Sequence, residues 1–421
     1  MRSVAGVLLA LALNAHAADG IEFDVDAFDK KPFELSGYLE VKPEYQWLDR
    51  DAALYALQFP GETRTTLART SAAAELSAVY RHDDVRLHAT AHASGAYDAR
   101  DTTRDLQFYE AYGAWQARTN VTVELGKRTL RWGKGYAWSP VAFYERAKDP
   151  TDPELAREGF VLLTGDLVRS FDGALKTLAF TPVLLPVSDD VNTEYGAGAH
   201  WNPGAKLYAL WYDTDIDLMV AAEGSRGARA GLDFSRNLGT NLEIHGEWAR
   251  FNDVPRTVLT TGNKILNEQR TVYGTLLGLR YLTEREATFI VEYYRNDGGY
   301  RADEMRHFYD LVRASATNPA FKSIAAQAAR GGYTAPNALR DYLYLRVSQK
   351  EPFDILYFTP ALTVMLNRND DSATLIPELG YTGITNFDVR LRAQFNRGAR
   401  GSEFGEKPLD ARAEFRVQYY F

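Results

Sequence analysis

The sequence contains no cysteine, so disulfide bonds, thiolate metal sites and a cysteine nucleophile are excluded. Beyond its N-terminus it has no run of about 20 apolar residues, which excludes transmembrane helices. The mean hydropathy of -0.34 agrees with this conclusion. The net charge of -8 argues against nucleic acid as a partner, because such proteins usually present a basic surface. Low-complexity tracts and visible domain boundaries are missing too, so we expect a single folded domain.

The N-terminus has the pattern of a secretory signal peptide. Arg2 provides a positive charge, Val4–Leu13 form a short apolar segment, and Ala15-His16-Ala17 fits a cleavage site. A buried N-terminal helix is the competing interpretation. No cysteine follows the site, so a lipoprotein is excluded. We predict a signal peptide at 1–17, a periplasmic N-terminal segment at 18–32 and a barrel at 33–421.

Most of the remaining chain alternates apolar and polar residues with a period of two, as strands with one apolar face do. These runs extend over about 10 to 15 residues, whereas soluble strands average about five or six. A tilted membrane strand needs about 9 to 11 residues, so the length favours a membrane protein. The clearest runs start at Phe33, Val85, Leu242, Phe387 and Ala411, and the last one ends at Phe421.

Short and long connections alternate along the chain. Tight turns such as His82-Asp83-Asp84 and Gly383-Ile384-Thr385 are separated by longer polar segments, which is typical of outer-membrane barrels. We therefore predict an all-β fold, a single transmembrane antiparallel β-barrel of about 18 strands, with about 16 as the alternative. Its short turns would be periplasmic and its long loops extracellular. The longer segments are Leu48–Thr65, Ala99–Asp105, Gly133–Glu158, Pro186–Gly204, Asn252–Gln269, Gly298–Asn337 and Gly398–Asp410.

One long segment contains a helical pattern. Within Arg301–Arg330, apolar residues such as Met305, Phe308 and Val312 recur at helical spacing, which predicts a helix. In an outer loop this helix would either fold inward as a constriction or plug, or form a solvated cap.

The alternation assigns the charged side chains of the strands to the barrel interior, because a charge that faces lipid is costly. Closure of the barrel would place the arginine-rich last strand beside the glutamate-rich first strand. Such walls either create a transverse field in a water-filled pore or neutralise each other and fill the lumen. The excess of arginine on the late strands favours anionic solutes. The predicted pore-lining residues are Glu34, Glu40, Glu44, Arg280, Arg346, Arg390, Arg392, Arg412 and Arg416.

The segment after the fifth predicted strand is rich in glycine, aromatic and basic residues. Its aromatic side chains could stack on sugars or aromatic solutes, and its cations could hold carboxylates. Alternatively, the aromatic residues mark the outer girdle, and Asp149-Pro150 and Asp152-Pro153 merely make turns. The predicted substrate-binding residues of this loop are Arg128, Arg131, Trp132, Lys134, Tyr136 and Trp138.

Catalysis has little support in the sequence, and we predict no catalytic residue. His88 and His92 share a strand face with Thr90 and Ser94. Neighbours on one strand face lie about 7 Å apart, so a nucleophile and its base usually come from different strands. A hydrolase would need a hydroxyl group within hydrogen-bond reach of His88, His92 or His245.

A metal site is not expected either. His245 lies between Glu243 and Glu247 on one strand face, which is better explained as polarity of the lumen than as a ligand set. We predict no metal and no cofactor.

Three segments resemble Gram-negative porin-like barrels: Lys30–Glu40, the Arg131-Trp132-Gly133-x-Gly135 loop and the closing Tyr419-Tyr420-Phe421. The nearest types are the alginate-export-like barrels and the substrate-specific porins. The resemblance implies passive passage of a solute or polymer. It also implies that the C-terminal aromatic residue is a signal for the barrel assembly machinery. It identifies no substrate.

We therefore predict a passive, porin-like channel in the cell outer membrane for small anionic solutes or an acidic polymer, and no enzyme. The first alternative is a closed barrel that serves as a receptor or assembly scaffold for an envelope partner. In that case Gly298–Asn337 and Asp19–Lys31 would fill the lumen. An outer-membrane hydrolase is less favoured. The expected partners are outer-membrane lipid, the barrel assembly machinery and the solute, while the oligomeric state stays open.

Overall fold

The structure is a computed structural model that describes residues 32–155 and 157–421. The predicted signal peptide at 1–17 and nearly all of the predicted segment at 18–32 lie outside the described residues. Phe33–Phe421 form one unit, which contains all the strands described below.

The unit is built from antiparallel strands of 8 to 18 residues. Their length agrees with the long alternating runs of the sequence. The strands are β1 (Phe33–Leu48), β2 (Thr66–His82), β3 (Val85–Asp98), β4 (Thr102–Arg118), β5 (Val121–Arg128), β6 (Phe160–Ser170), β7 (Leu175–Val187), β8 (His200–Trp211), β9 (Thr214–Ala221), β10 (Arg229–Asn237), β11 (Leu242–Leu259), β12 (Ile265–Leu282), β13 (Ala287–Asn296), β14 (Asp341–Gln349), β15 (Phe358–Asn367), β16 (Ser372–Tyr381), β17 (Phe387–Arg397) and β18 (Leu409–Tyr420).

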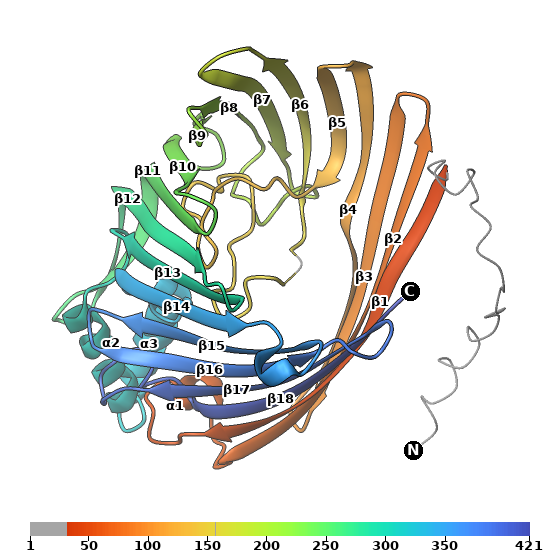
Figure 1. Ribbon diagram of the computed structural model, residues 1–421. Coiled ribbons are helices and arrows are strands. Elements are labelled where there is room, and N and C mark those ends of the chain that lie inside the picture. Colours follow the sequence, from red (N-terminus) through yellow and green to blue (C-terminus); the bar gives the residue numbers. More distant parts are fainter. Residues whose placement is uncertain (1–31, 156) are drawn as a thin grey trace. The chain divides into compact units, whose positions relative to one another are not determined.

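The strands form one 18-stranded sheet in which each strand pairs with its neighbours in the chain (Figure 1). The last strand also pairs with the first, with Leu39 opposite Tyr419 and Glu40 opposite Gln418. This pairing closes the sheet into a barrel and leaves no free edge. The prediction of a closed 18-stranded barrel is confirmed, and the alternative of 16 strands is excluded.

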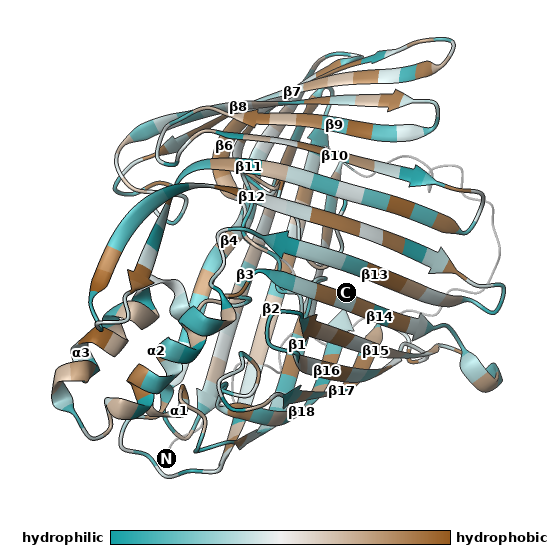
Figure 2. Ribbon diagram, turned by 90° about the vertical axis from the view of Figure 1, so that its left-hand side faces the viewer, coloured by the Kyte–Doolittle hydropathy of each residue, from teal (hydrophilic) through white to brown (hydrophobic). Residues whose placement is uncertain are grey.

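Apolar and polar side chains alternate along the strands, as the colours of Figure 2 show. Leu87 and Phe415 point outward and are exposed, whereas His92 and Glu414 point inward and are buried. Because successive side chains of a strand point to opposite faces, a period of two gives the barrel an apolar outside and a polar inside. Phe421, at which the last alternating run ends, is exposed as well.

Two of the segments predicted as long loops are shorter than expected. β11 continues to Leu259 and β12 begins at Ile265, so most of Asn252–Gln269 is strand, with a register shift between Phe251 and Val254. β4 likewise begins at Thr102, inside the predicted loop Ala99–Asp105. Near the ends of the barrel both faces of a strand can be polar, so the alternation that reveals a strand is lost there.

The predicted helix at Arg301–Arg330 is confirmed as a helical segment, but it consists of α2 (Ala302–Ala314) and α3 (Pro319–Ala328). Asn318 separates them: its side chain accepts a hydrogen bond from the Ala320 N–H and caps α3. These helices lie at one end of the strands (Figure 2). The shorter helical pieces are α1 (Tyr55–Gln58), η2 (Ala329–Tyr333) and η3 (Pro352–Asp354).

The buried face of α2 packs into the main apolar cluster of the barrel. Met305, Phe308 and Val312 share this cluster with Trp138 and Leu276. The helical segment is therefore attached to the loop after β5 as well as to the barrel wall. Among the described residues, no helix is long and apolar enough to cross a membrane.

Candidate functional site

The segment between β5 and β6, residues 129–159, lies inside the barrel ring (Figure 1). We call it the inner loop; residue 156 lies outside its described part. Besides β5 and β6, two separate parts of the barrel wall hold it, the β11–β13 part and the β17–β18 part. The chain therefore crosses the lumen here.

Carboxylates of β11 and β13 bind the backbone of the inner loop. Glu247 accepts hydrogen bonds from the N–H groups of Lys134 and Gly135, both at 2.6 Å. Glu292 accepts from the N–H groups of Tyr136 at 2.5 Å and Ala137 at 2.8 Å. Both carboxylates are almost fully buried. Since buried N–H groups need acceptors, these two side chains replace the partners that a strand would provide.

A glycine makes this close approach possible. Gly133 has a positive φ of +92°, and a Cβ atom there would lie 1.9 Å from Ser139 Oγ and 2.7 Å from Glu247 Oε1. The Ser139 hydroxyl also donates to Glu247, at 3.1 Å. Gly133, which follows Trp132, thus allows the tight turn of the loop over Glu247.

A third carboxylate, Glu145, belongs to the inner loop itself. Glu145 accepts a hydrogen bond from the Trp132 N–H and lies 3.2 Å from the Arg157 guanidinium. Burial raises the pKa of Glu145 to about 7, although both partners favour its charged form. At its start the loop is tied to β4, because the Thr129 N–H donates to Glu110 at 2.9 Å.

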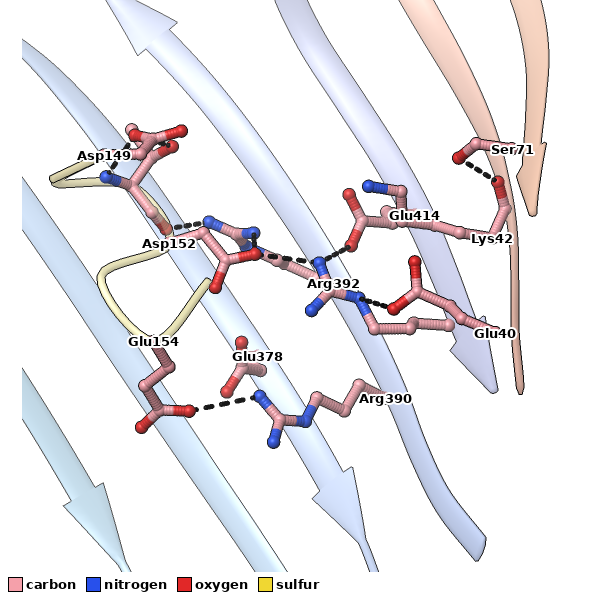
Figure 3. A network of polar contacts seen from close by, with 12 residues as sticks. Glu40, Lys42, Ser71, Asp149, Asp152, Glu154, Glu378, Arg390, Arg392 and Glu414 are labelled. Carbon is pink, nitrogen blue, oxygen red and sulfur yellow. Dashed lines mark hydrogen bonds and ion pairs between the residues drawn. The ribbon is translucent and has the colours of Figure 1, made fainter. Parts of the chain in front are cut away.

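The far side of the inner loop is tied to the arginines of β17 and β18 (Figure 3). Asp152 lies 2.8 Å from Arg416 and 3.6 Å from Arg392. Glu154 lies 3.5 Å from Arg390. Although burial opposes the charge of Asp152, these arginines hold its pKa below the ordinary value. Three of the arginines predicted to line the pore therefore bind the loop.

A cavity of about 500 Å³ remains beside the inner loop. Its wall carries charges of both signs, including the ion pairs Arg346–Glu378 and Arg390–Glu154. Cationic and anionic side chains are equal in number: Lys134, Lys148, Arg346 and Arg390 face Asp152, Glu154, Glu243 and Glu378.

The seam between β1 and β18 carries the predicted arginine and glutamate walls. Arg412 lies 3.7 Å from Glu44, and Arg416 lies 3.8 Å from Glu40. Their predicted proximity is confirmed by the pairing of the first and last strands. Glu34 lies apart from this group and pairs with Arg81 of β2 at 2.8 Å.

Two further predicted pore-lining arginines lie on other strands. Arg346 of β14 pairs with Glu378 of β16 at 3.3 Å and borders the cavity. Arg280 of β12 lies opposite Glu243 in the strand register, and both interact with the Tyr136 hydroxyl. All nine predicted residues thus occur beside opposite charges or loop groups, and their role in conduction stays a prediction.

The two tryptophans predicted to bind substrate are buried inside the protein. Trp132 packs edge-on against Tyr144 at 5.4 Å, and Trp138 stacks on Tyr294 at 5.0 Å. Both are less than a tenth exposed. They anchor the inner loop in two apolar clusters, and Trp132 also borders a cavity of about 460 Å³.

The other predicted loop residues are distributed over different surroundings. Arg128 pairs with Glu124, and Lys134 pairs with Asp217 at 2.8 Å. Burial opposes the charge of Lys134, but Asp217 raises its pKa above the ordinary value. Tyr136 borders the 500 Å³ cavity, while Arg131 is exposed and borders another one.

The sequence did not single out three further residues of the inner loop that hold it or border the cavity: Glu145, Lys148 and Asp152. Lys148 donates to the Gly135 carbonyl and borders the cavity. A charged residue within a glycine- and proline-rich loop is normally interpreted as exposed to solvent. The strand residues that bind this loop are distant in sequence, so no local pattern reveals them. The Asp-Pro pairs were a usable signal, because they mark the turn that presents Asp152 to β18.

The histidines considered for a metal site and for a hydrolase can also be located in the structure. His245 Nε2 lies 3.0 Å from Glu292 Oε1, so this histidine supports the anchoring of the inner loop. No group of three possible metal ligands occurs among residues 32–155 and 157–421. His88 does have hydroxyl groups within hydrogen-bond distance.

No protein-family model matches the sequence, and no curated relative matches it. Solved structures do resemble the fold. OccK5 (OpdH) of Pseudomonas aeruginosa is 12% identical, with a TM-score of 0.52, and the match covers 92% of this chain and 98% of that one. OccK11 (OpdR) of the same organism is 12% identical, with a TM-score of 0.50, covering 92% and 96%. A Rhodopseudomonas blastica porin is 10% identical, with a TM-score of 0.43, covering 92% and 100%.

These likenesses concern the fold. The chain has the barrel fold of Gram-negative outer-membrane porins, and the predicted porin-like outer-membrane barrel is confirmed at that level.

Proposed function

We propose that this chain spans the outer membrane as a passive, porin-like channel, and that the inner loop forms its constriction. The observation that carries the proposal is the crossing of the lumen by a loop tied to both walls, with a charged cavity beside it. The likeness to porins in fold supports the same function.

The outer surface supports a place in the membrane. Leu106 is 76% exposed and Trp201 is 65% exposed, although both are large apolar side chains. In water such a belt would be costly at about 25 cal/mol per Å² of apolar surface, and lipid would cover it. Charged side chains such as Glu247, Glu292 and Arg416 are buried on the inner face. A charge that faced lipid near the midplane would cost about 2–4 kcal/mol.

We propose that small anionic solutes are preferred. Most ions along the cavity have a partner of opposite charge, but among the described residues Lys148 has no carboxylate within ion-pair distance. Burial lowers the pKa of Lys148, while Glu247 counteracts this shift. An anion beside Lys148 would relieve the cost of its partly desolvated charge. The cavity is in the size range of small-molecule sites, which favours a small solute over a polymer.

Single-channel recordings in planar bilayers test both parts of the proposal. The reversal potential in a KCl gradient should indicate preference for chloride, and K148Q should shift it toward potassium. K350Q is the matched control, because Lys350 is a surface residue that pairs with Glu286 at 3.6 Å. Folded protein that never opens would refute the channel and favour the closed receptor or scaffold. Equal reversal potentials for K148Q and K350Q would refute the role of Lys148.

A further inference from the structure

A serine, a histidine and a glutamate converge on the lumen face of β2, β3 and β4. Ser77 Oγ lies 3.1 Å from His88 Nε2, and His88 Nδ1 lies 3.4 Å from Glu110 Oε2. The three side chains come from three neighbouring strands. This is the arrangement of nucleophile, base and orienting carboxylate that acyl-transfer enzymes use on unrelated folds.

The strand register explains why these groups meet. Ser77 lies directly opposite Thr90, and Thr90 lies directly opposite Glu110. His88 is two residues from Thr90 and therefore on the same face of β3. Its ring can reach the neighbouring strands on both sides, which residues along a single strand could not do.

Both hydroxyl groups lie within hydrogen-bond distance of His88 Nε2, Ser77 Oγ at 3.1 Å and Thr90 Oγ1 at 3.2 Å. When the Thr90 hydroxyl donates to Ser77 Oγ at 3.2 Å, the Ser77 hydroxyl donates to His88 Nε2. The Nδ1 nitrogen of His88 then carries its proton toward Glu110. Glu110 is itself held, since its other oxygen accepts the Thr129 N–H at 2.9 Å. Tyr112 packs edge-on against the imidazole at 5.1 Å and limits its rotation.

His88 and Glu110 are accessible from the lumen, and Ser77 beside them is half-buried. The side chains of His88 and Glu110 are 17% and 24% exposed, and both border a cavity of about 460 Å³. Arg128, Arg131, Trp132 and Lys206 line the same cavity. Arg128 and Lys206 have carboxylate partners, whereas Arg131 has none within ion-pair distance among the described residues. A ligand that brings its own negative charge would therefore fit this cavity.

We propose that Ser77, His88 and Glu110 form a hydrolytic site for small esters that carry an anionic group. Ser77 Oγ attacks the ester carbonyl carbon while His88 Nε2 takes the serine proton. The tetrahedral intermediate then collapses: the carbon–oxygen bond to the leaving alcohol breaks, and the alkoxide takes the proton from His88. Water, activated by the same nitrogen, hydrolyses the acyl-serine and restores the hydroxyl. Glu110 is a positioning residue that orients His88 and stabilises its cation. Thr90 can turn its O–H from Ser77 to the developing oxyanion.

The chain offers a matched control for each member. Ser71 is on the same face of β2, and its hydroxyl contacts the Lys42 carbonyl at 3.4 Å. His92 and Glu75 form a pair at 3.4 Å on the same wall. Substitutions at these positions change the same residue types in the same part of the lumen.

The first test is covalent labelling of the folded full-length protein in detergent by a fluorophosphonate probe, with the modified peptide identified by mass spectrometry. Ser77 should be labelled in the unaltered protein and in S71A and H92Q. Labelling should fall by about 100-fold or more in H88Q, the usual contribution of a general base. Heat-modifiable gel mobility reports the folded fraction of every variant. Absence of a label at Ser77, or equal labelling of H88Q and H92Q, would overturn the proposal.

The second test compares hydrolysis of 4-acetoxybenzoate with that of phenyl acetate, which lacks the carboxylate. The anionic ester should be preferred, and R131Q should remove the preference. E110Q should lower the rate by at least about 100-fold and change its pH profile, whereas E75Q should not. Conductance of S77A should be unchanged, so loss of the ester activity and failure of the channel are separate outcomes. Equal rates for S77A and S71A would refute the site.

Discussion

Asp152 offers the sharpest test of the inner loop as a constriction. Its carboxylate lies between Arg416 at 2.8 Å and Arg392 at 3.6 Å, with the Asp152 side chain only 17% exposed. D152N keeps the size of the side chain and removes its charge. Removing one partner of a buried ion pair costs about 3–5 kcal/mol. We expect about 2 kcal/mol here, because water in the lumen screens the charges.

A loss of about 2 kcal/mol raises the population of the detached inner loop by about 30-fold, since about 1.4 kcal/mol corresponds to a factor of ten. Single-channel recordings should then show transitions to a wider state about 30 times more often than in the unaltered protein. D149N is the matched control. Asp149 is on the same loop but is exposed, and its carboxylate accepts only from Thr151 among the described residues. Identical recordings for D152N and D149N would refute the tether.

Acid should weaken the same tether in the unaltered protein. The arginines hold the pKa of Asp152 below the ordinary value of 3.8, against the effect of burial. A carboxylate with a lowered pKa stabilises the folded state above its unfolded pKa, and this stabilisation is lost as the pH falls through the folded pKa. Transitions to the wider state should therefore stay rare above about pH 5 and become frequent only at strongly acidic pH. The D152N channel should lack this change.

Two further predictions concern the support of the inner loop. Burial raises the pKa of Glu145 from 4.5 to about 7, so its contribution to stability should fall as the pH rises between these values. E145Q should remove this slope in thermal unfolding between pH 4.5 and pH 7, and a slope unchanged by E145Q would contradict the assignment. G133A should displace the loop from Glu247 and change the open-channel conductance, because its Cβ would overlap Ser139. G173A, in an open turn with a similarly positive φ, is the control, and equal conductance of the two would contradict the role of Gly133.

The barrel itself could be predicted because its signal is local. Along β18 the outward Phe415 and the inward Glu414 follow one another, and each reports its own environment. The same reasoning failed over Asn252–Gln269, where β11 and β12 extend beyond the two-faced part of the barrel. There Arg256 pairs with Glu304 of α2, so polarity did not indicate a loop.

The roles of individual site residues were harder to predict. Arg392 and Arg416 were correctly assigned to the interior, but their partner Asp152 lies in a segment whose path no local pattern encodes. Trp132 and Trp138 were predicted to stack on a solute or, alternatively, to mark the outer girdle. Both are buried, since the loop folds inward and requires apolar anchors of its own.

The sequence alone predicted an exported-type pattern, a barrel of about 18 strands and the inward or outward face of the residues in its clearly alternating runs. Period-two alternation depends only on neighbouring residues and on the two environments of a barrel wall, so one chain suffices to read it. The position of the inner loop in the lumen became clear only from the tertiary structure. The contacts that hold the inner loop join Gly135 to Glu247 and Asp152 to Arg416, which are more than 100 residues apart in each case. Such pairs depend on the arrangement of distant segments in the folded barrel, and the convergence of Ser77, His88 and Glu110 likewise depends on the register of three strands.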